Sequence, residues 1–225
     1  MADLTILYIT ASELPKSFAE YQMSVLLDAA GDYPIISASR QPLDLGINIL
    51  DTEQRHISNI YRQILKMAKL AETEFVAIAE DDTLYHKDHF NFYRPDSDTF
   101  AYDQNRFALF TWGEPTYSWR NRKSNASLIA PRLLLIEALE ERFAKYPEGT
   151  PAKLTGEVGR NKLEKQLGLT ERKSIEVFCE QSMIQINHDT GTEDRQRSHR
   201  KRLGQIKAFD IPHWGKASDI IANYK

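Results

Sequence analysis

The stretch Phe75-Val76-Ala77-Ile78-Ala79-Glu80-Asp81-Asp82 decides the fold class of this chain. Five apolar residues in a row, followed at once by three acids, are typical of a buried strand that ends at carboxylates. In open α/β sheets, ligands bind beyond the carboxyl ends of the strands, because helix starts and free backbone amides meet there. The sequence therefore predicts a ligand site at Glu80, Asp81 and Asp82.

Strand and helix patterns alternate before this stretch. Residues 4–10 and 34–39 are almost continuously apolar, so we expect two buried strands. Apolar residues at helical spacing predict one helix between these strands and a second over 52–71, with Thr52 as its cap. The long β-α-β crossover predicts parallel strands, and hence a central, mostly parallel sheet flanked by helices. The expected fold class is a Rossmann-like α/β domain.

The pattern beyond residue 90 is less regular. We expect a helix that begins around Pro131 and a short helix over 161–167 inside the polar segment 150–173. The remaining strand-like stretches are 106–112, 127–130, 174–178 and 182–187.

Composition limits the alternatives. The 225 residues, 41% of them hydrophobic, suffice for one substantial core, so we expect a single domain over 1–225. No stretch has the apolar length of a membrane span or the pattern of a signal peptide, which favours a cytoplasmic protein without a membrane partner. The single cysteine, Cys179, excludes an intrachain disulfide, and its apolar neighbours indicate packing rather than nucleophilic catalysis.

Three successive carboxylates repel one another and call for a compensating cation. A hard divalent ion such as Mg²⁺ or Mn²⁺ takes one or two protein carboxylates and fills its other positions with water and phosphate oxygens. The alternative is that Asp82 caps a helix or turn beginning at Thr83, while Glu80 and Asp81 are solvated.

The order of these features resembles a known family. The first strand ends in Thr10-Ala11, the second in Ser39-Arg40, a helix carries Asn59 and Arg62, and the acidic stretch follows. Over roughly residues 1–90 this order is similar to the amino-terminal half of GT-A-fold, family-2-like glycosyltransferases. The resemblance implies a metal-dependent enzyme that moves a sugar from a nucleotide diphosphate sugar, with a UDP-sugar as the expected donor and Mn²⁺ or Mg²⁺ as cofactor.

The resemblance also implies roles for individual residues. Asp82 would be the principal metal ligand and Asp81 a supporting carboxylate, whereas Glu80 stands where the family has Asp. Residues 1–90 would hold the donor, 91–190 the acceptor, and 191–225 would form a basic tail or lid. The other positions implied to contact the nucleotide or its diphosphate are Thr10, Ala11, Ser39, Arg40, Arg62 and Lys216.

The remaining catalytic groups have two candidates each. Glu180, after a strand, and Glu114, beside aromatic residues, are candidates for the base that deprotonates the acceptor, and an ordinary surface carboxylate is the alternative for both. His188 and His213 are candidates for completing the metal site. We favour His188 because it directly follows a strand, and a structural histidine is the alternative.

The strongest local charge anomaly lies in 195–202. It is either a solvated loop, a lid over the diphosphate, or a contact to DNA or RNA phosphates. Its candidate nucleic-acid-binding residues are Arg195, Arg197, Arg200, Lys201 and Arg202.

The compact chain also looks like small phage-type glycosyltransferases, some of which modify hydroxymethylated pyrimidines in DNA. That acceptor would place the protein in the host cytoplasm. A non-catalytic nucleic-acid-binding protein using 195–202 is the competing function. A nucleotidyltransferase is less favoured, because no glycine-rich, lysine-containing loop follows the first strand.

Overall fold

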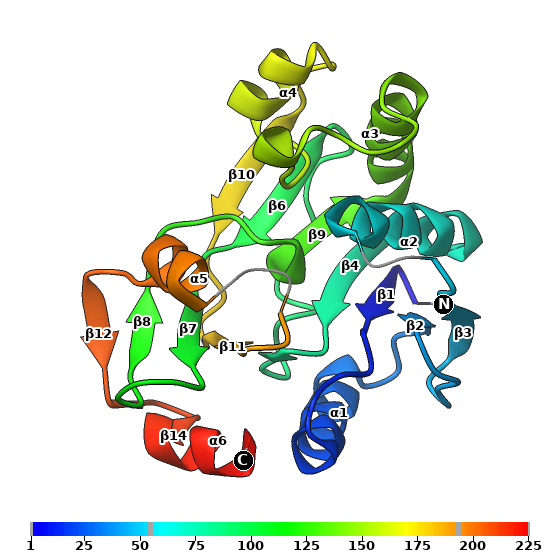
Figure 1. Cartoon of the computed structure of the whole chain (residues 1–225). Helices are drawn as coiled ribbons and strands as arrows, with labels where there is room; N and C mark the ends of the chain where they lie inside the picture. The colour runs from blue at the N-terminus through cyan, green and yellow to red at the C-terminus, as the bar shows by residue number, and fades with distance from the viewer. Residues whose placement is uncertain (1, 54–55, 192–194, 225) are drawn as a thin grey trace.

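The structure is a computed structural model that describes residues 2–53, 56–191 and 195–224. Its main sheet has seven strands in the order β10-β6-β9-β4-β1-β2-β3 (Figure 1). All neighbouring pairs are parallel except those of β9, which runs antiparallel to both β4 and β6. The prediction of an α/β fold with a mostly parallel central sheet is confirmed. The strands are β1 (Leu4–Ile9), β2 (Ile35–Ser39), β3 (Ile47–Leu50), β4 (Phe75–Glu80), β6 (Thr99–Asp103), β9 (Leu128–Pro131) and β10 (Lys173–Val177).

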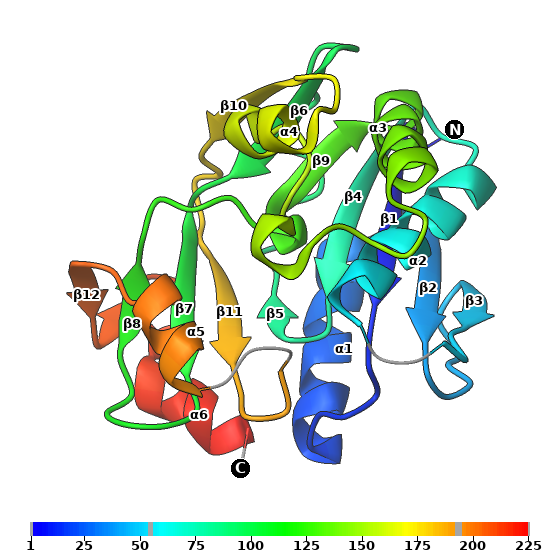
Figure 2. The same cartoon turned by 45° about the horizontal axis from the view of Figure 1, so that its top comes forward.

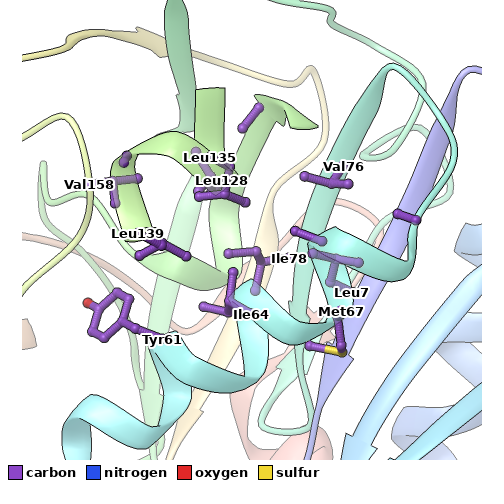
Figure 3. Close-up of a cluster of buried hydrophobic side chains, with 14 of the residues drawn as sticks. Leu7, Tyr61, Ile64, Met67, Val76, Ile78, Leu128, Leu135, Leu139 and Val158 are labelled. Atoms are coloured by element: carbon purple, nitrogen blue, oxygen red, sulfur yellow. The ribbon is translucent and has the colours of Figure 1, made fainter. Parts of the chain in front are cut away.

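Helices cover both faces of this sheet. α2 (Ile57–Leu70) and α3 (Arg132–Lys145) pack on one face, where Ile64 and Leu139 meet Ile78 of β4 (Figure 3). α1 (Lys16–Ala30) covers the other face through Leu26. Because side chains alternate along a strand, Leu7 joins the first cluster while Ile6 joins the second. This two-sided burial explains why the strands read as continuous apolar runs.

A second sheet has five strands in the order β12-β8-β7-β11-β5. Its strands are β5 (Thr83–Leu84), β7 (Arg106–Phe110), β8 (Tyr117–Trp119), β11 (Met183–Asn187) and β12 (Ile206–Ala208). It packs with α6 (Ala217–Tyr224) and the first turn of α1 around Phe18, and a two-stranded sheet of β13 (Asp210–Ile211) and β14 (Gly215–Lys216) adjoins α6. The chain passes from the main sheet to this one through Asp81 and Asp82, so the acidic residues lie at the junction of the two sheets.

Several sequence-based boundaries were wrong. The helix predicted over 52–71 begins at Ile57, and His56 rather than Thr52 caps it, because Nδ1 of His56 accepts the backbone N–H of Ser58 at 3.2 Å. Thr83 begins a strand and not a helix, so Asp82 caps no helix. Residues 195–202 form α5 (Arg195–Arg202) instead of an irregular loop. The remaining helix, α4 (Asn161–Leu167), has the predicted bounds.

None of the helices in the described ranges combines the length and apolar character that crossing a bilayer requires.

Candidate functional site

A cavity of about 880 Å³ opens at the carboxyl ends of β1 and β4. Residues of the first turns of α2, of the segments 120–125 and 152–166, of the end of β11 and of α5 line it. In Figure 2, α5 lies on one side of the end of β4 and α2 on the other. Glu80, Asp81 and Asp82 all line this cavity, as expected for residues at the end of a central strand.

Hydrogen bonds hold the three carboxylates in different ways. Oγ1 of Thr10, at the end of β1, donates to Oδ2 of Asp81 at 2.5 Å. Nε2 of Gln185, in β11, donates to Oε2 of Glu80 at 3.2 Å and to Oδ1 of Asp82 at 3.4 Å. Side chains from both sheets therefore orient the acidic residues.

Burial and repulsion raise the pKa values of Glu80 and Asp81. Burial, reinforced by the charge of Asp82, raises the pKa of Glu80 from 4.5 to about 8. The same two causes raise the pKa of Asp81 from 3.8 to about 7, although the hydrogen bond from Thr10 acts in the opposite direction. The negative charge is thus poorly compensated by the chain itself, which is the condition under which a cation binds.

Gln185 is held by a buried arginine. Nη1 of Arg106 donates to Oε1 of Gln185 at 2.7 Å, so Nε2 of Gln185 faces the carboxylates. Nη2 of Arg106 donates to the carbonyl oxygen of Arg122 at 2.9 Å, and burial lowers the pKa of Arg106 to about 10. Sequence reasoning missed this pair, although a glutamine inside the buried run Met183–Asn187 is a usable signal.

The residues of the cavity fit an open metal site that water and phosphate oxygens complete, and they do not fit a closed cage of protein ligands. In the described part of the chain, no three His, Cys, Asp or Glu side chains form a group that could hold a metal ion by itself. A closed protein cage of the calcium or zinc type is therefore a poor fit. Mg²⁺ and Mn²⁺ need only one or two protein carboxylates when water and phosphate oxygens supply the rest, and Asp81 and Asp82 in a polar cavity match that requirement.

The cavity brings together about two thirds of the predicted site residues. His188 is in its wall, where Nδ1 lies 2.8 Å from Oγ1 of Thr190. The side chain of Arg195 lies outside the described residues. The other predicted residues that line the cavity are Thr10, Ala11, Arg40, Asp81, Asp82, Arg197, Arg200, Lys201 and Arg202.

Five predicted site residues do not line the cavity. The guanidinium of Arg62 lies 4.7 Å from the ring centroid of Phe143 and bonds to the carbonyl oxygen of Pro147, so it faces the end of α3. Ser39 is buried and donates to the carbonyl oxygen of Gln41 at 2.6 Å.

The other three are exposed residues outside the cavity wall. Glu114 lies in the β7–β8 connection, Glu180 follows β10, and Lys216 belongs to β14. Each was predicted from its place after a strand or beside a motif. Such local signals do not show which way a loop side chain turns. His213 is also outside the cavity, with its ring 4.3 Å from that of His86.

α5 is firmly attached beside the cavity. Nη1 of Arg120 donates to the carbonyl oxygens of Arg200 at 3.0 Å and of Lys201 at 2.9 Å. The ring of His199 packs edge-on against Phe110 at 4.8 Å. The chain that leaves α5 then runs against β8, where a Cβ on Gly204 would lie 1.6 Å from the Trp119 carbonyl oxygen. Glycine is required at that position because the two backbones approach so closely.

The cavity also contains charged residues that the sequence did not single out. Glu157 is almost fully buried and accepts from Nη1 of Arg160 at 2.9 Å. Asp51 accepts from the amides of Asn59 at 2.8 Å and Gln63 at 2.5 Å. Additional cations come from the segments 120–122 and 152–162, namely Arg120, Arg122, Lys153 and Lys162.

No protein-family model and no curated protein matches the chain. Among solved structures it is similar to a glycosyltransferase involved in the glycosylation of the major capsid of PBCV-1, with 13% identity over 88% of this chain and 98% of that chain, at a TM-score of 0.46. The mannosyltransferase PcManGT from Pyrobaculum calidifontis, in complex with GDP-Man and Mn²⁺, aligns with 12% identity over 88% of this chain and 60% of that chain, also at 0.46.

A nucleotide-transferring enzyme is similar to the same degree. 2-C-methyl-D-erythritol 4-phosphate cytidylyltransferase from Thermus thermophilus aligns with 13% identity over 81% of this chain and 92% of that chain, at a TM-score of 0.46. Likenesses at these identities and scores assign no function to this chain.

Proposed function

We propose that this protein is a metal-dependent glycosyltransferase that takes a sugar from a nucleotide diphosphate sugar and passes it to a hydroxyl group. One observation carries the proposal: half-buried carboxylates at the end of β4 line a cavity whose wall includes the basic helix α5. Cleavage of the bond between the sugar and the diphosphate concentrates negative charge on the diphosphate. A site that contains both carboxylates for a metal and basic side chains is suited to receive that charge.

Residues from both halves of the chain have roles in this proposal. Asp82 and Asp81 would hold a divalent ion, and that ion would neutralise charge on the departing diphosphate. Thr10 orients Asp81, and Gln185 orients Asp82. Arg202, which lines the cavity and whose charge acts on Glu80, approaches the diphosphate from α5. Since the cavity is lined by residues from Ile9 to Arg202, we propose that the chain acts as one catalytic domain.

The acceptor expected from the sequence, a 5-hydroxymethylpyrimidine in DNA, belongs to the same proposal. It is supported by the position of α5, whose Arg197, Arg200, Lys201 and Arg202 line the cavity instead of facing only bulk solvent. A primary alcohol on a base is an ordinary acceptor, provided that the base can enter the cavity. The competing function, binding of nucleic acid without catalysis, requires neither the carboxylates nor a metal.

Thermal unfolding with a panel of nucleoside diphosphates tests the donor half of the proposal. UDP, GDP, CDP and ADP are each added with and without Mn²⁺, because a ligand that binds only the folded protein raises the melting temperature. We expect one nucleotide to stabilise the protein in a Mn²⁺-dependent way. Incubation with the matching nucleotide sugars and hydroxymethylated DNA should then add the mass of one sugar. The proposal would be refuted if no nucleoside diphosphate stabilised the protein and no nucleotide sugar was hydrolysed.

A further inference from the structure

Part of the cavity wall carries basic residues that have no role in the proposed binding of the donor. We use the name basic wall for the exposed, cavity-lining residues Arg120, Lys153, Lys162 and Arg200. In the described ranges, none of these four has a carboxylate within 4.0 Å. Arg120 bonds to carbonyl oxygens of α5, which carry no net charge. Among the residues that the structure describes, these four cations have no acidic partner, and all four line one cavity.

Two of the three segments that supply the basic wall are tied to β10, since Ser174 donates to the carbonyl oxygen of Gly159 at 2.5 Å and Asn121 donates to Glu176 at 3.2 Å. β10 is the edge strand on one side of β4, whereas β1, which is followed by Thr10, is on the other side. These two segments therefore lie on the opposite side of the acidic residues from Thr10. A donor at Thr10 and the acidic residues leaves the basic wall for another molecule.

The distribution of the cations indicates what that molecule is. They come from three segments, 120–122, 152–162 and α5, and they line a cavity of about 880 Å³, which is larger than one phosphate group fills. A chain with a phosphate at every unit matches several cations distributed over the wall of one large cavity. The amides of Asn121 and Gln166 line the same wall and can bond to the edges of unstacked bases.

From these observations, and resting on the proposed function, we propose that the basic wall binds the phosphodiester backbone of a single-stranded or locally opened nucleic acid that carries the acceptor hydroxyl. An intact duplex is excluded because the acidic residues lie inside the cavity, and a base must leave the stack to reach them. The strand and the donor occupy different parts of the cavity and bind together.

Two lysines on α4 provide a matched pair for the test. Lys162 lines the cavity, whereas Lys165, one turn further along the helix, is also exposed and does not line it. The probe is a fluorescein-labelled oligothymidine of about 15 nucleotides, followed by fluorescence anisotropy at several salt concentrations. We expect Lys162→Glu to weaken binding about 5- to 10-fold and to reduce the salt slope by about 1 to 2, with Lys165→Glu within about twofold of the unmodified protein.

Competition experiments separate this inference from the proposed function. UDP with Mn²⁺ should leave oligothymidine binding within about twofold, since the two ligands occupy different regions. Complete displacement by UDP with Mn²⁺, an equal loss in both lysine variants, or equal competition by polyglycerol phosphate would overturn the inference. If no nucleoside diphosphate stabilises the protein while the lysine pair still behaves as expected, the proposed donor chemistry fails and the nucleic-acid site stands.

Discussion

Arg106 and Gln185 form a buried pair in which Nη1 of the arginine donates to Oε1 of the glutamine at 2.7 Å. The two residues are far apart in the chain but lie on the adjacent parallel strands β7 and β11. Because Oε1 of Gln185 accepts this hydrogen bond, Nε2 of the same side chain faces Glu80 and Asp82. Arg106 thus orients the neutral side chain of Gln185, and Gln185 in turn orients Glu80 and Asp82. Arg106 does this without forming an ion pair with either carboxylate.

Replacing Gln185 with alanine should weaken metal binding. Residues that orient metal ligands typically contribute about 10-fold or more to affinity, so we expect the dissociation constant for Mn²⁺ in the presence of nucleoside diphosphate to rise by about 10-fold. Electron paramagnetic resonance of free Mn²⁺ measures this constant. Gln166→Ala removes another amide from the same cavity and should change it less than twofold. Equal effects of the two substitutions would exclude an orienting role for Gln185.

Replacing Asp82 with asparagine should stabilise the metal-free protein while removing function. The charge of Asp82 contributes to the raised pKa of both Glu80 and Asp81, so its removal relieves repulsion in a buried site. We expect the free energy of unfolding to rise by about 1 kcal/mol. Stabilisation by nucleoside diphosphate with Mn²⁺ should disappear. Asp44→Asn, on the surface, should change neither quantity, and a destabilised Asp82→Asn protein would count against this account.

The metal-free protein should lose stability as the pH rises from about 6 to about 8. The folded-state pKa values of Asp81 and Glu80, about 7 and about 8, lie above the ordinary values of 3.8 and 4.5. Between about pH 6 and about pH 8 the folded state therefore binds more protons than the unfolded state. Stability that is present at low pH is lost as Asp81 and Glu80 ionise in the folded protein. Urea unfolding in EDTA at several pH values measures the slope. The slope should be smaller in Asp82→Asn, and a stability that increases over this range would contradict the assignment.

Replacing Arg120 with glutamine should loosen α5. The substitution removes the donor that the carbonyl oxygens of Arg200 and Lys201 share. One such interaction contributes about 1 kcal/mol, so amide hydrogen exchange at the end of α5 should accelerate by about 5-fold. Exchange in α3 serves as the internal reference and should not change. Arg132→Gln, at the start of α3, is the matched variant and should leave exchange in α5 unaltered.

The local order of residues was enough to predict the amino-terminal strands. β1, β2 and β4 are buried on both faces and read as apolar runs, and the acids that follow β4 mark the site edge. β6 was not predicted, although all five of its residues are buried. Thr99 and Asp103 bound it with polar side chains, and only its pairing with β9 and β10 makes it a strand.

Some residues of the site could likewise be predicted from the local sequence, whereas others are placed only by the tertiary structure. Asp81, Asp82 and Thr10 could be predicted because strand ends are local features and parallel strands bring them to one edge. Gln185 reaches Glu80 and Asp82 only because β11 pairs with β5 in a register that places it opposite Thr83. The positions of Arg120, Lys153 and Lys162 likewise depend on segments that are hydrogen-bonded to β10 through Asn121 and Gly159. Periodicity is a property of neighbours in sequence, whereas strand register and loop anchoring are set by contacts between distant segments.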